Sequence, residues 1–362
     1  DLRRTSMQKK IKLRHEVTQF MWDYLSKKDF THIETPILIK STPEGARDYV
    51  VPSRIKNGAF YALPQSPQQM KQILMVSGFD RYFQIARCFR DEDLRADRQP
   101  EHTQLDLEMS FVHQKDVMDL VEGLYINLIK NINEKISIDN SFERLTYDES
   151  IERFGSDKPD LRFEIELTEL SKIAKNIESN IIQNSLKNKS ILKAVVAKGW
   201  HTLGRRDFDR LTDLVKKQGA GGLIYISIPE GIDGKINLEN TSGPLNKFYT
   251  QENLDQIIAE TGAKSGDVIF MIIGDKKIVN TSLSFLRSHI AKEKNLIDKN
   301  LMKFAWITDF PLFDQDEDGS WQPAHHVFSS PHEEDNKFLD NDPGKVRANL
   351  FDLVCNGVEL GS

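Results

Sequence analysis

The residues best suited to chemistry lie between Phe83 and Phe111, where two alternating stretches flank a strongly charged loop. The apolar positions of the second stretch are Leu105, Leu107, Met109 and Phe111. This period of two predicts an antiparallel pair of strands with one packed face and one polar face. The polar face would carry Arg90 and Asp106 over a rigid sheet, which suits holding a nucleotide and an acid together. The pattern alone leaves open an ordinary amphipathic hairpin with a solvated loop.

Two residues of the first stretch need separate explanations. Arg87 falls in the apolar register, so we expect it to reach a sheet edge or a partner. Cys88 is expected to be a small core residue rather than a nucleophile.

The end of the chain offers a second pair of acids. Asn356-Gly357 is a strong signal for a two-residue hairpin turn. A tight turn would set Val354 opposite Glu359 and Asp352 opposite Gly361. Asp352 and Glu359 would then project from one face, close enough to share a hard cation such as Mg²⁺. From the spacing alone, a metal-binding pair and two unrelated acids on a solvated sheet face are equally well supported.

Composition indicates a soluble protein of two or three domains, with 362 residues, 39% hydrophobic, 29% charged and a net charge of −6. No apolar run approaches the length of a membrane span, and the opening DLRRTSMQKK does not resemble a signal peptide. Two cysteines cannot build a disulfide framework, which favours the reducing cytoplasm. The acidic balance does not exclude nucleic acid, because binding to phosphate needs only a local basic cluster such as Arg90, Arg95 and Arg98.

Apolar periodicity predicts amphipathic helices over 5–28 and 114–133. Pro36 suggests a sheet edge or a break between strands. Residues 161–300 are rich in Lys, Ile, Asn and Ser and alternate between strand and helix patterns, so they are expected to form a separate α+β unit inserted into the rest. The glycine-rich segment 219–224 lacks the lysine and the strand-to-helix context of a phosphate-binding loop, which favours a plain turn.

Several segments resemble the class II aminoacyl-tRNA synthetases of the bacterial aspartyl type. RDEDLRADRQPEHTQLD, from Arg90, is similar to their motif 2, and IETPILIKSTPEGARDYVVPSR, from Ile33, is similar to the end of motif 1 and a mobile substrate-covering loop. LPQSPQQMKQ, from Leu63, resembles their aspartate pocket, and PAHHVFSSP, from Pro323, brings a histidine pair. The matches are long and run along nearly the whole chain.

The resemblance implies an α+β fold in which helices flank an antiparallel sheet. Residues 1–160 would be the first part of the catalytic domain, 161–300 an inserted domain of the GAD type, and 301–362 the second part of the catalytic domain. It also implies a cytoplasmic homodimer with Pro36 at the dimer interface.

The implied activity is ATP-dependent formation of aspartyl-adenylate with Mg²⁺, followed by transfer of aspartate to tRNA(Asp). The aspartate-binding positions would be Glu44, Ser66, Gln68, Lys71, Arg90, Asp106, His325 and His326. The ATP-binding positions would be Arg90, Asp91, Glu92, Gln99, His102 and Glu359. Asp352 and Glu359 would bind the metal, and Arg95 and Arg98 would contact the tRNA acceptor end.

The chain departs from the family pattern at both ends. The resemblance places an anticodon-binding domain before residue 1, and an aspartate-clamping arginine and motif 3 after Ser362. We therefore expect that this chain is a fragment and that by itself it does not charge tRNA. Two alternatives remain at this point: an ATP-dependent aspartate amidating enzyme, and a non-catalytic relative that binds tRNA. Whether tRNA(Asn) is also charged stays open, as does the role of the insert.

Overall fold

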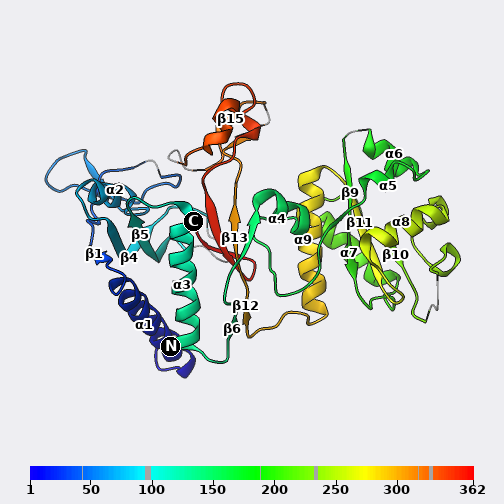
Figure 1. Cartoon of the computed structure of the whole chain (residues 1–362), viewed down its shortest axis with the longest axis horizontal. Helices are drawn as coiled ribbons and strands as arrows, with labels where there is room; N and C mark the ends of the chain where they lie inside the picture. The colour runs from blue at the N-terminus through cyan, green and yellow to red at the C-terminus, as the bar shows by residue number, and fades with distance from the viewer. Residues whose placement is uncertain (43, 94–98, 188, 232–234, 317, 326–328) are drawn as a thin grey trace. The chain divides into compact units, whose positions relative to one another are not determined.

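The computed structural model describes every residue except 43, 94–98, 188, 232–234, 317 and 326–328 (Figure 1). The described chain forms two compact units. The first comprises Asp1–Ser141 with Gln322–Ser329, and the second comprises Phe142–Trp321 with Ser330–Ser362. The three-part division predicted from the sequence stays a prediction.

The first unit is built on the hairpin of β4 (Arg81–Phe89) and β5 (Glu101–Met109). β1 (Thr31–His32) pairs in parallel with β4. The other elements of this unit are α1 (Thr5–Ser26), β2 (Val50–Pro52), β3 (Phe60–Ala62), α2 (Gln68–Val76), α3 (Gln114–Ile132) and β6 (Ser137–Ile138). The helices predicted over 5–28 and 114–133 are confirmed.

The predicted hairpin is confirmed, and its apolar face forms the core of this unit. Leu105, Leu107 and Met109 pack against Leu25 of α1 and Phe30. Phe111 was expected to continue this face, and that expectation is wrong. β5 ends at Met109, and Phe111 lies beyond it with a left-handed φ of 58° and 98% of its surface exposed.

A four-stranded sheet of order β10-β11-β9-β8 forms one half of the second unit. Its strands are β8 (Thr168–Glu169), β9 (Ile191–Ala197), β10 (Ile224–Ser227) and β11 (Val268–Gly274), and all their pairings are antiparallel. Helices cover it on both faces, so β9 and β11 read as nearly continuous apolar runs.

The helices α7 (Arg205–Lys216) and α9 (Lys276–Glu293) pack on one face of this sheet. The helices α5 (Ser171–Ala174), α6 (Asn180–Leu186) and α8 (Gln251–Thr261) pack on the other. The glycine-rich segment after α7 turns the chain from a helix into β10, with Gly219 at a φ of 96°, as the plain-turn prediction requires.

A second sheet of order β17-β16-β13-β7 completes this unit. Its strands are β7 (Glu143–Thr146), β13 (Phe304–Thr308), β16 (Phe351–Cys355) and β17 (Val358–Gly361), and α4 (Tyr147–Phe154) packs against it. Short elements connect these parts: η1 (Leu238–Asn240), η2 (Asn246–Phe248), β12 (Leu301–Met302), β14 (Phe313–Gln315), β15 (Trp321–Pro323), η3 (Glu333–Phe338) and η4 (Pro343–Lys345).

The fold is therefore a mixed α+β fold with largely antiparallel sheets flanked by helices, as predicted, in which the β1–β4 and β7–β13 pairs are parallel. No helix in the described ranges has both the length and the apolar character needed to cross a membrane.

Candidate active site

The polar face of the β4–β5 hairpin is a partly buried floor rather than a fully solvated surface. In the antiparallel register Gln84 stands opposite Asp106, and Cys88 stands opposite His102. Helix α2 packs against both strands, and only 5% of Asp106 is exposed. Cys88 is fully buried, and burial raises the pKa of its thiol to about 12, so it is a core residue as predicted.

Arg87 occupies an apolar position in the alternation of β4, and its side chain finds a partner on the neighbouring strand. It lies exposed on the hairpin, and its guanidinium is 3.3 Å from the carboxylate of Glu101. An ion pair between the strands therefore accommodates this charge at the surface.

Lys71 reaches from α2 onto the floor and makes a buried ion-pair cluster there. Its Nζ lies 3.0 Å from Asp106 Oδ1 and 3.2 Å from Glu108 Oε2. Burial lowers the pKa of the Lys71 ammonium, but the two carboxylates outweigh burial, so the net pKa is raised. Burial raises the pKa of Asp106 against the opposing effect of Lys71. Lys71 therefore stays charged at neutral pH, next to a carboxylate that is costly to ionise.

Two polar atoms on this floor lack hydrogen-bond partners within the described part of the chain. They are Nε of Arg90, which follows the end of β4, and Oδ2 of Asp106, and both are buried. Buried donors and acceptors are satisfied in most native structures. A donor and an acceptor that both lack partners are what a site for a zwitterionic ligand would present.

Thr42 and the residues 44–48 of the next loop are fastened to the residues that lead into α2. Ser66 Oγ donates to Glu44 Oε2 at 2.7 Å, and Thr42 Oγ1 donates to Glu44 Oε1 at 2.9 Å. The backbone N–H of Gln68 donates to Ser66 Oγ at 3.3 Å. A cavity of about 210 Å³ lies here, lined among others by Glu44 and Ser66. The structure thus brings three predicted aspartate-binding residues together.

Gln65 was missed by the sequence reasoning and is the main fastening of this loop. Its side chain is 1% exposed, accepts from the N–H of Ala46 at 3.0 Å, and donates to the Ala46 carbonyl at 2.8 Å and to Asp48 Oδ1 at 2.5 Å. Only its place between two prolines in LPQSP could have drawn attention to it.

Four of the predicted nucleotide-binding residues, Asp91, Glu92, Gln99 and His102, belong to the same unit as Arg90. Asp91 forms an isolated β-bridge with Arg47, and Glu92 donates its backbone N–H to the Arg90 carbonyl at 3.0 Å. His102 is half-buried on β5, and burial, followed by the charge of Arg90, lowers the pKa of its imidazole. Gln99 is exposed. Arg95 and Arg98, predicted to contact tRNA, lie outside the described residues.

The carboxylate pair at the end of the chain forms in the second unit, with a corrected register. The turn at Asn356-Gly357 is confirmed, with φ angles of 53° and 84°. Val354 pairs with Glu359 as predicted, but Gly361 pairs with Leu353 rather than with Asp352. The prediction for Gly361 was wrong because the register shifts between Leu353 and Val354.

Asp352 and Glu359 nevertheless lie close enough for their charges to interact. Asp352 is 7% exposed. Burial, with a further contribution from Glu359, raises its pKa to about 7. No group of three or more His, Cys, Asp or Glu side chains in the described ranges could hold a metal ion. The pair fits Mg²⁺, which is usually bound by one or two carboxylates together with substrate phosphates and water.

The predicted histidine pair is described only in part. His325 is half-buried in the segment Gln322–Ser329, which belongs to the first unit. His326 lies outside the described residues.

Comparison with known proteins decides the family. A sequence profile described as "tRNA synthetases class II (D, K and N)" matches residues 1–362. The chain belongs to this family. This class II synthetase chain is 45% identical to the aspartate-tRNA(Asp/Asn) ligase of Dehalococcoides mccartyi (strain CBDB1) over 363 residues, which cover 99% of this chain and 61% of that protein. It is 46% identical to the aspartate-tRNA ligase of Staphylococcus aureus (strain Newman), covering 100% of this chain and 60% of that protein. The chain thus spans about three-fifths of the length of these curated relatives.

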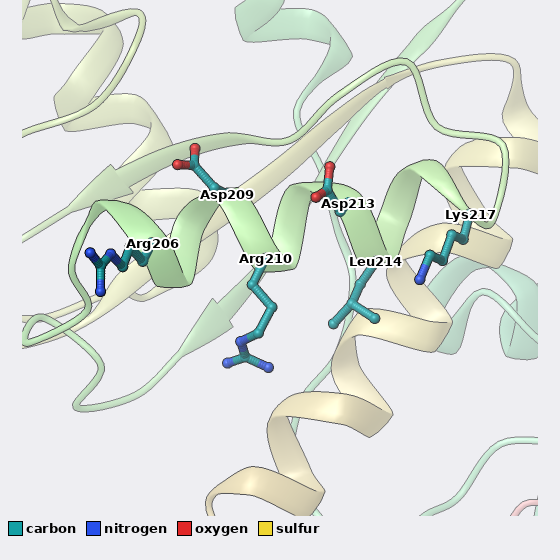
Figure 2. Close-up of a pocket in the computed structure, with 6 residues that line it drawn as sticks. All are labelled: Arg206, Asp209, Arg210, Asp213, Leu214 and Lys217. Carbon is teal, nitrogen blue, oxygen red and sulfur yellow. The ribbon is translucent and has the colours of Figure 1, made fainter.

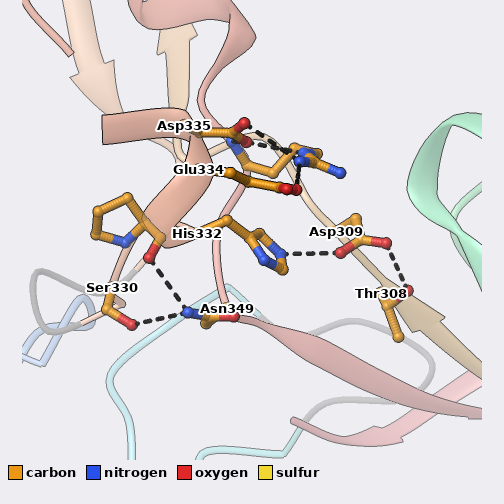
Figure 3. Close-up of polar contacts among 9 residues, drawn as sticks. Thr308, Asp309, Ser330, His332, Glu334, Asp335 and Asn349 are labelled. Carbon is orange, nitrogen blue, oxygen red and sulfur yellow. Dashed lines mark hydrogen bonds and ion pairs between the residues drawn. The ribbon is translucent and has the colours of Figure 1, made fainter. Parts of the chain in front are cut away.

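A polar network in the second unit of this synthetase chain holds the residues that follow the histidine pair (Figure 3). His332 Nε2 lies 2.9 Å from Asp309 Oδ1 at the end of β13, and Asp309 has a left-handed φ of 58°. Arg347 donates from Nε to Asp335 Oδ2 at 2.8 Å. Asn349 donates to the Pro331 carbonyl at 3.2 Å. Sequence reasoning did not single out this network, because its partners are distant in the chain.

A second hollow of the synthetase chain lies elsewhere, along α7 (Figure 2). It measures about 430 Å³ and is lined by Arg206, Asp209, Arg210, Asp213, Leu214 and Lys217. Arg210 is engaged there by Glu293 at 2.6 Å. None of the predicted site residues lies in this hollow, so we assign no chemistry to it.

Proposed function

We propose that this synthetase chain activates L-aspartate with ATP and belongs to a protein that transfers it to tRNA(Asp). The observation that carries the proposal is a pair of buried atoms, Arg90 Nε and Asp106 Oδ2, to which the described part of the chain offers no hydrogen-bond partner, on the same floor as the Lys71 ammonium. Together they offer a site for an anion, a site for an ammonium group and a fixed positive charge. Both relatives described above are named aspartate-tRNA ligases, which supports the same conclusion.

Recognition of aspartate rests on charge, because aspartate and asparagine have nearly the same shape. An ammonium has three donors and no acceptor. Lys71 already faces two carboxylates and makes a long hydrogen bond of 3.5 Å to the Leu107 carbonyl, and this third donor would turn from the carbonyl to the side-chain carboxylate of aspartate. An amide in that place would not gain the charge-assisted hydrogen bond that a carboxylate makes with the ammonium.

The remaining residues of the pocket would hold the rest of the amino acid. Asp106 Oδ2 and Ser66 would receive the ammonium group of the substrate, and Glu44, which already accepts a hydrogen bond from Ser66, would join them. Gln68 would lie beside the substrate, and the histidine pair His325 and His326 would border its side chain. The loop fastened over this pocket would exclude water from the adenylate.

Activation needs alignment more than it needs a base. The α-carboxylate of aspartate is ionised at neutral pH and attacks the α-phosphorus of ATP, releasing pyrophosphate. Arg90 would hold both the α-phosphate and the attacking carboxylate, so that the two anions meet in line. Asp91, Glu92 and Gln99 would contact the nucleotide, and His102 would stack on adenine.

The carboxylates Asp352 and Glu359 would hold Mg²⁺ and contribute to ATP binding. When bound, the ion neutralises charge on the phosphates of ATP. The low exposure of Asp352 and its electrostatic interaction with Glu359 support this assignment. A buried carboxylate next to a second one is stabilised in its ionised form by a cation.

The proposed partners beyond small molecules are tRNA and a second copy of the chain. Arg95 and Arg98 would contact the acceptor end of tRNA(Asp), and the Asp/Asn name of one relative makes tRNA(Asn) a second candidate. Exposed apolar residues next to Pro36, namely Ile37 at 48% and Leu38 at 54%, support a homodimer interface there. Residues 161–300 would be the inserted GAD-type domain.

The experiment supplies the whole protein to which this chain belongs with ATP, Mg²⁺ and labelled aspartate, together with either tRNA or ammonia. We expect aspartyl-tRNA with tRNA and no asparagine with ammonia. Asparagine formed from ammonia would instead identify an amidating enzyme. Absence of ATP binding in the protein would indicate a non-catalytic relative.

A further inference from the structure

The carboxylate pair of the second unit already has a cation beside it. Lys158 Nζ lies 2.6 Å from Glu359 Oε2, and both side chains are about one-third exposed, at 34% and 32%. The charge of Lys158 also acts on Asp352, as does that of the neighbouring Asp157. None of the sequence motifs pointed to this lysine.

The segment that carries Lys158 is held firmly against the β16–β17 hairpin. Its N–H donates to Ser156 Oγ at 3.0 Å, and the next residue, Pro159, is buried and restricts the backbone of Lys158. A Cβ placed on Gly357, in the hairpin turn, would come within 3.3 Å of Asp160 Cβ. Close packing at the turn therefore fixes the distance between this segment and the strand that carries Glu359.

Arg287 of α9 fastens the same segment from the other side. It is 1% exposed, and it donates to the backbone carbonyls of Asp160 at 3.0 Å and Ile165 at 2.8 Å. Side chains that are locked in this way hold a neighbouring group more tightly than a free loop does. The position of Lys158 is thus built into the fold, and it depends on a helix of the region predicted to be an insert.

We propose that Lys158 is the resident cation of the Asp352–Glu359 pair and opposes the binding of a bare divalent ion there. The inference rests on the metal role that the proposed function gives to this pair. An ion shared by the two carboxylates would meet the Lys158 ammonium at short range, and repulsion between these like charges weakens binding on the order of tenfold. A metal ion that is bound to a polyphosphate brings phosphate oxygens, and these can accept hydrogen bonds from the Lys158 ammonium. Lys158 thereby favours metal–nucleotide over metal alone.

The test measures binding of Mn²⁺ alone, which suits carboxylate ligands, to the full chain by calorimetry. We expect Lys158→Met to bind Mn²⁺ about tenfold more tightly than the native chain. Lys158→Arg keeps the positive charge and is expected to bind like the native chain. Adding Glu359→Gln to the Lys158→Met variant should abolish the gain, which assigns the gain to this pair.

The outcomes separate this inference from the proposed function. Equal Mn²⁺ affinity in the native and Lys158→Met chains, with binding that still depends on Glu359, overturns the role of the lysine and leaves the metal pair intact. Absence of Glu359-dependent binding in every variant overturns the metal pair and, with it, the inference. Circular dichroism checks folding, and Lys158→Gln, which is also neutral, carries the same expectation if the Met variant does not fold.

Discussion

Replacing Lys71 by methionine tests the buried cluster on the β4–β5 floor. The change leaves Asp106, which is 5% exposed, and the nearby Glu108 without the ammonium that lies 3.0 and 3.2 Å away. Removing one partner of a buried ion pair costs about 3–5 kcal/mol, because the remaining charge is left uncompensated. We expect a loss of this size at pH 8 in the free energy of local opening of β4 and β5.

The loss should depend on pH in a defined direction. Burial raises the folded-state pKa of Asp106 above its unfolded value. Such a group contributes stability below its unfolded pKa and loses that contribution as the pH rises through its folded pKa. Without Lys71 the folded pKa of Asp106 rises further, so protonation at pH 5 relieves part of the strain. The variant should therefore be less destabilised at pH 5 than at pH 8.

The assay is amide hydrogen exchange of β4 and β5, read by mass spectrometry at both pH values after correction for intrinsic exchange rates. Lys115→Met is the matched control, because Lys115 pairs with Asp119 on the exposed surface of α3 and such pairs are worth less than about 1 kcal/mol. A loss below about 1 kcal/mol for Lys71→Met, equal at both pH values, would refute the reasoning.

Three further predictions concern single residues. Gln65→Ala removes the hydrogen bonds that fasten the loop over 41–48, which should lower the free energy of local opening of this loop by about 1.4 kcal/mol. Trypsin should therefore cut after the exposed Arg47 about tenfold faster. An unchanged rate would contradict the role of Gln65. The folded pKa of Asp352, about 7, lies above the unfolded value of about 3.9, so its contribution to stability is lost as the pH rises to 7 and above. Asp352→Asn should therefore be more stable than the native chain at pH 8, by up to about 4 kcal/mol in urea unfolding, and the gain should vanish at pH 4. Arg287→Met leaves two backbone carbonyls without their donor and should lower the stability of the second unit by about 1–3 kcal/mol, whereas a neutral outcome would show that water replaces the guanidinium.

Local patterns predicted much of the fold. The alternation between Phe83 and Met109 placed both strands of the hairpin, since side-chain direction in a strand follows directly from position. The Asn356-Gly357 turn was also predicted, because few residues other than these adopt two successive left-handed conformations. Phe111 was misplaced, since nothing in an alternating pattern marks where the pairing stops.

Contacts between distant segments were not predicted. The polar face around Asp106 is buried because α2 packs on it, and alternation alone cannot show what covers a face. The register shift next to Leu353 is likewise a local irregularity without a sequence signal. Lys158 lies 201 positions before Glu359, as their numbers show, so only the folded chain brings the two together. The resemblance supplied residue roles, and the structure supplied their partners.

The central claim is that the site selects aspartate by charge, and aspartate-dependent exchange of pyrophosphate into ATP tests it most directly. The protein is given aspartate or asparagine at equal concentration, and Lys71→Met is measured beside the native form. We predict exchange with aspartate that exceeds exchange with asparagine at least 100-fold, and a collapse of this ratio in the variant. Equal exchange with both amino acids in the native protein, or an unchanged ratio in the variant, would contradict the account.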